Sequence, residues 1–78
     1  MRSSEGFRWA AAAQHLLAVR RPQQAEQVVR QHLREQPWEV SAHILLALAL
    51  YRQDRMPEAR TAVHKALGLD PKIGRAHV

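Results

Sequence analysis

Histidine is the residue type in this chain that most readily suggests chemistry, because imidazole binds metals and exchanges protons near neutral pH. The chain has five histidines, His15, His32, His43, His64 and His77. No two of them have the helical spacing that a metal site needs, and no HExxH motif occurs. We therefore expect no metal site. His32 and His43 are expected to pack on helices, with a ring nitrogen hydrogen-bonded or in water.

Nucleophilic catalysis and phosphate binding have little support in the sequence. Cysteine is absent, and Ser3, Ser4, Ser41 and Thr61 are isolated hydroxyls without a placed base. The three glycines are scattered, so no phosphate-binding loop is present, and Gly68 is typical of a helix C-terminus. We predict that the protein is not an enzyme and uses no cofactor.

Arginine dominates the charge of the chain, whose formal net charge is +5. Such a balance raises the question of a nucleic-acid partner, which a cluster of basic residues would favour. Two arginine pairs fall at equivalent predicted turns, Arg20 with Arg21 and Arg52 with Arg55. Aromatic residues are too few and too separated to stack on bases. A solvated surface is the expectation, and nucleic-acid binding through the turn arginines is kept as the alternative.

Composition indicates a folded helical segment, with 46% hydrophobic and 24% charged residues. The longest weakly polar stretch, residues 9–19, falls well short of the roughly 20 apolar residues that span a bilayer. Glu5 and the lack of a cleavage site argue against a signal peptide. We predict no membrane span, and the sequence leaves the compartment open.

An internal repeat of 34 residues organises the chain. Laying residues 6–39 over residues 40–73 aligns Ala13 with Ala47, Leu16 with Leu50, Arg21 with Arg55, Ala25 with Ala59, Val29 with Val63, Leu33 with Leu67, and Pro37 with Pro71. The matched apolar residues recur at helical spacing, so each unit is predicted to contain two one-sided helices. The predicted helices cover residues 6–20, 22–36, 39–53 and 56–68.

Four prolines punctuate these helices. Pro22 and Pro57 stand where the second helix of each unit begins, a place that tolerates the missing N–H. Pro37 and Pro71 follow the second helices and end them. Within the second helix, Glu26 and Arg30 have the spacing of a favourable ion pair.

The pattern resembles the tetratricopeptide repeat, W-x2-L-G-x2-Y, A-x3-F and P. The matching residues are Trp9, Ala12, Ala13, Leu16, Ala25, Val29 and Pro37, then His43, Leu46, Ala47, Leu50, Ala59, Val63 and Pro71. Neither unit has the family's Gly, Tyr or Phe, His43 replaces Trp, and His32 stands where a small residue is usual. The resemblance implies an all-α fold of two tandem helix-turn-helix hairpins that form a short right-handed α-solenoid. Repeat 1 would cover residues 6–39 and repeat 2 residues 40–72, after a disordered N-terminus at residues 1–5.

The resemblance also implies a function, because this family's first helices line a concave groove that receives peptides. The expected partner-binding residues are Phe7, Gln14, Leu17, Ile44, Leu48, Tyr51 and Arg52. Tyr51 and Arg52 are the strongest of these, since Tyr and Arg are enriched in interface hot spots. An alternative is that Leu17 and Leu48 pack between adjacent helices. The chain is predicted to be a protein-protein interaction scaffold that binds a peptide or partner helix.

The last six residues, IGRAHV, break the helical pattern. They resemble the translated sequence of a sequencing-library adapter, so residues 73–78 are expected to be a non-native tail. The preceding residues would then be a piece of a longer repeat protein. Repeat arrays bury each unit against the next. We therefore expect Val63, Leu67 and Leu69 to lack cover, with self-association through the last helix as one consequence.

Overall fold

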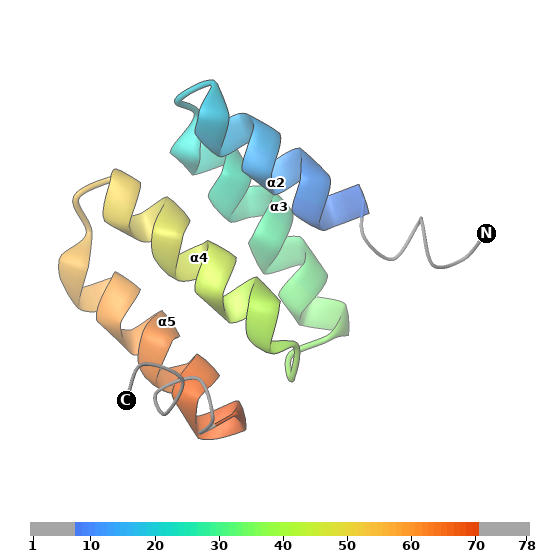
Figure 1. The fold of residues 1–78 in the computed structure, drawn as a ribbon, viewed down its shortest axis with the longest axis vertical. Helices are drawn as coiled ribbons and strands as arrows, with labels where there is room; N and C mark the ends of the chain where they lie inside the picture. The colour runs from blue at the N-terminus through green and yellow to red at the C-terminus, as the bar shows by residue number, and fades with distance from the viewer. Residues whose placement is uncertain (1–7, 71–78) are drawn as a thin grey trace.

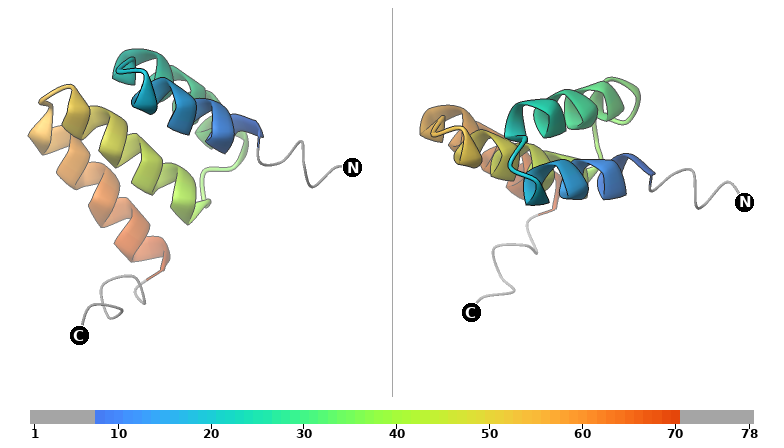
Figure 2. Two further views of the ribbon diagram at one scale, coloured as in Figure 1. Left: turned by 45° about the horizontal axis from the view of Figure 1, so that its top comes forward. Right: turned by 90° about the horizontal axis from the view of Figure 1, so that it is seen from above.

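The structure is a computed structural model that describes residues 8–70, and it contains four α-helices and no strand within them. The helices are α2 (Arg8–Ala18), α3 (Pro22–Glu35), α4 (Val40–Arg52) and α5 (Met56–Leu69). They form two antiparallel hairpins, α2 with α3 and α4 with α5 (Figure 1). Helix α4 contacts each of the other three, so it lies between the first hairpin and α5 (Figure 2).

The predicted helices are confirmed, and the last three agree with the structure to within one residue at either end. Helix α2 ends at Ala18, two residues before its predicted end, because Arg20 adopts a positive φ of 63°. The predicted disordered N-terminus and the predicted non-native tail both lie outside the described residues. The right-handed solenoid stays a prediction, since two hairpins define only one step of a superhelix.

The two hairpins repeat one another in backbone geometry as well as in sequence. Arg21 N–H donates to the carbonyl of Leu16 at 2.7 Å, and the corresponding Arg55 N–H donates to Leu50 at 3.0 Å. Pro22 and Pro57 both lie in the first turn of their helices, as predicted. N–H groups in a first turn have no acceptor inside the helix, so proline loses nothing there. The 34-residue offset is therefore a structural period.

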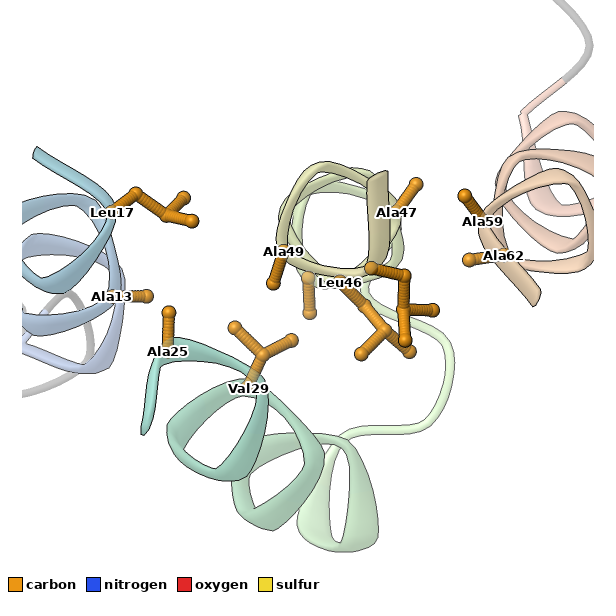
Figure 3. Close-up of a cluster of buried hydrophobic side chains, with 11 residues drawn as sticks. Ala13, Leu17, Ala25, Val29, Leu46, Ala47, Ala49, Ala59 and Ala62 are labelled. Carbon is orange, nitrogen blue, oxygen red and sulfur yellow. The ribbon is translucent and has the colours of Figure 1, made fainter. Parts of the chain in front are cut away.

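The core is built mainly from alanine. Its largest fully buried side chains are Leu50 and Val29. Around them lie the buried residues Ala13, Leu17, Ala25, Ala42, Leu46, Ala47, Ala49, Ala59 and Ala62. Figure 3 shows the labelled side chains of α2, α3 and α5 gathered around those of α4. Small side chains let helix backbones approach closely, so a chain of this length closes a core with few large residues.

Candidate interaction surface

An apolar groove of about 380 Å³ runs between α4 and α5, and we call it the α4–α5 groove. Its lining residues are Ile44, Ala47, Leu48, Tyr51, Met56, Ala59, Arg60, Val63 and His64. Eight large hydrophobic side chains are exposed within residues 8–70, and five of them line this groove. Gathered apolar exposure of this kind marks an interaction site more often than scattered exposure does.

Helical spacing gathers the groove's side chains into two facing rows. On α4, Ile44, Leu48 and Tyr51 follow one another at intervals of four and three residues, which puts them on one stripe. On α5, Met56 and Val63 contribute the opposite row. Between the rows, Ala47 and Ala59 lie on the facing sides of the two helices and are buried (Figure 3). The floor is therefore shallow and smooth, which suits an elongated apolar occupant.

The first hairpin has a face that corresponds to this groove, and α4 packs against that face. Leu17 and Val29 correspond to Tyr51 and Val63 at the 34-residue offset. Leu17 and Val29 both point toward α4 and are 7% and 0% exposed (Figure 3). Tyr51 and Val63 are instead 57% and 42% exposed. The α4–α5 groove is thus the face of the second hairpin that corresponds to the one covered by α4 in the first.

The structure brings three of the predicted partner-binding residues together. Ile44, Leu48 and Tyr51 all line the α4–α5 groove and all are exposed. Leu48 therefore does not pack between adjacent helices, which was the alternative for it. Arg52 is exposed beside Tyr51 but lines a different groove, and Gln14 is exposed on α2.

Two other predicted residues do not contribute. Leu17 is buried in the core against α4, so the packing alternative holds for it and it is removed from the candidate contacts. Phe7 lies outside the described residues. The predicted partner-binding residues did not include Met56 and Val63, because they were taken from the first helix of each unit only. Val63 was nevertheless expected to lack cover, and it is 42% exposed. The repeat itself carried the signal, since Val29 occupies the corresponding place in the first hairpin.

A polar network lies at the edge of the face of the first hairpin that α4 covers. Glu26 on α3 is buried, and its Oε2 accepts a hydrogen bond from Arg30 Nε at 2.7 Å. Its Oε1 accepts from Gln53 Nε2 at 2.9 Å and from Arg55 Nη1 at 2.8 Å. Arg55 also donates from Nε to Glu58 at 2.9 Å. The predicted Glu26–Arg30 pair is confirmed, and the network additionally joins α3 to the turn that follows α4.

Electrostatics favour the charged forms of this network. Burial raises the pKa of the Glu26 carboxyl, but hydrogen bonds from Gln53 and Arg30 and the charge of Arg55 outweigh burial and hold that pKa below its usual 4.5. The hydrogen bond to Glu58 raises the pKa of Arg55, and the same bond lowers the pKa of Glu58. The network therefore stays ionised at neutral pH.

Comparison with known proteins decides the family. A family model described as the tetratricopeptide repeat matches residues 16–77. The chain belongs to the tetratricopeptide repeat family. No curated protein and no solved structure matches the chain. Tetratricopeptide repeats generally serve as protein-protein interaction scaffolds.

Histidines occupy two places in the repeat pattern, and both pack as predicted. His43 stands at the tryptophan position of repeat 2, is buried, and donates from Nε2 to the carbonyl of Pro37 at 2.7 Å. His32 stacks on Trp9 with 4.1 Å between the ring centroids. Its Nε2 lies 3.2 Å from a Glu39 oxygen without the alignment of a hydrogen bond. His32 therefore takes its place in the repeat by stacking on Trp9, and His43 does so by hydrogen bonding to the turn between the hairpins.

Metal ligands do not gather in the described part of the chain, where no three His, Asp or Glu side chains come close enough to hold an ion. None of the helices at residues 8–70 is long and apolar enough to cross a membrane.

The turn arginines do come together. Arg20, Arg21, Arg52 and Arg55 line one polar groove of about 560 Å³ at the ends of α2 and α4. Arg55 is already bound to Glu26 and Glu58, so its charge is largely compensated. Arg20, Arg21 and Arg52 are exposed. The described part of this tetratricopeptide repeat chain therefore carries this basic groove in addition to the apolar α4–α5 groove.

Proposed function

We propose that this protein is an interaction module whose α4–α5 groove binds an amphipathic helix from a protein partner. The supporting observation is the internal repeat. In the first hairpin the corresponding face is covered by α4, which is itself an apolar helix. The second hairpin presents the same backbone and the same alanine floor, with Tyr51 and Val63 exposed. An occupant of the same shape therefore fits.

Physical considerations agree with helix binding. A helix that lies in a groove recognises its partner through anchors on one face, at intervals of three and four residues. Burial of a large apolar side chain contributes about 1.5 to 3 kcal/mol, and the groove offers five such side chains. Tyr51 is the best anchor among them, since it combines a large apolar ring with a hydroxyl that can bond at the rim.

The experiment uses a synthetic peptide of residues 39–55, because this segment covers the corresponding face of the first hairpin. Fluorescence anisotropy would follow its binding to the full chain at moderate salt. We expect Tyr51→Ala and Val63→Ser each to weaken binding at least about tenfold, as hot-spot truncations do. Trp38→Ala is the matched control, since Trp38 is 61% exposed and lies outside the groove. Equal losses in all three variants would contradict the assignment.

Self-association is a second way to cover the same groove. Sedimentation velocity over a range of concentrations would detect it, and Val63→Ser should then reduce the dimer fraction. If the chain stays monomeric at high concentration, the occupant of the groove is a different protein.

The basic groove supports the alternative function, nucleic-acid binding. Binding through Arg20, Arg21 and Arg52 would fall steeply with salt, because phosphate contacts release counterions. A gel shift with single-stranded and duplex DNA at low salt tests it, with Arg52→Gln as the variant. No shift of the wild-type protein at low salt would exclude this function.

A further inference from the structure

Position 60 carries the opposite charge to its counterpart in the first hairpin. Glu26 and Arg60 correspond at the 34-residue offset, on α3 and α5. Glu26 is the acceptor for Gln53 and Arg55, the residues that follow the helix filling the first hairpin. Arg60 is exposed and lines the α4–α5 groove, and no ion pair within residues 8–70 involves it.

This reversal changes what an occupant must offer. A helix in the α4–α5 groove with the orientation of α4 would place its C-terminal turn beside Arg60, as the turn after α4 lies beside Glu26. A donor such as an amide N–H or a guanidinium would meet another donor there. A carboxylate would find a partner and would neutralise a charge that the bound helix removes from water.

We propose that the α4–α5 groove selects a partner helix with an acidic residue in the turn after its C-terminus, and that Arg60 binds this carboxylate. The inference rests on the proposed helix-binding function and names the chemistry of the partner. The other polar groups of the groove are the Tyr51 hydroxyl and the His64 ring. Arg60 carries the one guanidinium among the described lining residues, so it supplies most of the charge selectivity.

The same geometry disfavours a second copy of this chain as the occupant. A second copy would offer α2, whose following turn carries Arg21 at the place corresponding to Arg55. Arg21 would then face Arg60, and two guanidinium groups repel each other. This repulsion disfavours head-to-tail stacking of identical chains through the groove. A partner with an acidic residue at that place is not disfavoured.

Two peptides test the proposal. One is residues 39–55 of this chain, and the other is the same peptide with Gln53→Glu and Arg55→Glu. Each is titrated into the wild-type chain and into Arg60→Glu at low and moderate salt. The wild-type chain should bind the acidic peptide about five- to tenfold more tightly, and salt should reduce the preference. Arg60→Glu should reverse it in favour of the unmodified peptide.

The control variant is Arg34→Glu, which makes the same change in net charge at an exposed place on α3 away from the groove. It should keep the wild-type preference. If both peptides bind the wild-type chain equally and Arg60→Glu leaves their ratio unchanged, the charge selectivity is refuted while helix binding stands. If neither peptide binds the wild-type chain, there is no binding for Tyr51→Ala to weaken, and the proposed function itself fails.

Discussion

Arg20 and Asp54 adopt the same left-handed backbone conformation, with φ of 63° and 62°, in the turns that close the two hairpins. They correspond at the 34-residue offset. Outside glycine this conformation costs roughly 1 kcal/mol or more, and Asp tolerates it better than Arg because its short side chain can bond locally. Both turns therefore hold backbone strain, and the first turn holds more of it.

Replacing Arg20 with glycine should relieve this strain. We expect Arg20→Gly to raise the free energy of unfolding by about 0.5 to 1 kcal/mol, and Asp54→Gly to raise it by less. Urea denaturation followed by circular dichroism measures both. Gln27→Gly is the control, since it lies exposed inside α3 and should lower stability by about 1 kcal/mol. A loss of stability in Arg20→Gly would contradict the strain argument.

Leu17 and Tyr51 should respond oppositely to truncation although they occupy the same place in the repeat. Leu17→Ala should lower the free energy of unfolding by about 2 to 4 kcal/mol, because it leaves a cavity between the first hairpin and α4. Tyr51→Ala should change stability by less than about 0.5 kcal/mol, as exposed substitutions do. Thermal and urea denaturation of the two variants measures both changes. Equal losses of stability would contradict the finding that α4 covers Leu17 but leaves Tyr51 exposed.

Ala49 should not tolerate a larger side chain. It is fully buried on the side of α4 that faces the first hairpin (Figure 3). Ala49→Leu should therefore cost about 1 to 3 kcal/mol through overpacking. Ala11→Leu is the control, because Ala11 is exposed on α2 and has room for the larger side chain. Unfolding midpoints in urea would be compared, and a wild-type midpoint for Ala49→Leu would mean that the helices are less closely packed.

Glu26 should make stability depend on pH on the acid side. Its folded pKa lies below the unfolded value of 4.5, so its contribution is fully present above that value. The contribution is lost as pH falls through the lower folded pKa. Glu26→Gln should cost about 1 to 3 kcal/mol at neutral pH, since Gln53 and Arg55 lose an ionised acceptor.

The same variant should also flatten the acid limb of the stability profile. Melting temperatures measured between pH 7 and pH 3 would show it, because wild type should lose more stability than Glu26→Gln over that range. Glu35→Gln, on the exposed end of α3, should keep the wild-type slope. Parallel profiles for wild type and Glu26→Gln would contradict the assignment of the lowered pKa to this network.

Local information in the sequence was enough to predict the helices, and the 34-residue repeat indicated the hairpins and the family. Apolar residues at intervals of three and four give each helix a buried stripe. Pro22 and Pro57 lie in the first turns of the second helices, because proline fits there. The Glu26–Arg30 pair was predictable for the same reason, since both residues lie on one helix. These features depend on neighbours within a few residues, and the sequence displays such neighbours directly.

Tertiary structure decided which of two corresponding residues is covered. Leu17 and Tyr51 occupy the same position in the repeat, yet one is in the core and the other is exposed, because α4 lies over the first only. Likewise, the partners of Glu26 at Gln53 and Arg55 are far along the chain and meet it only after α4 has packed. Burial and long-range hydrogen bonds depend on which residues of another helix pack against a side chain. Helical periodicity carries no information about those residues, because they are distant in the sequence.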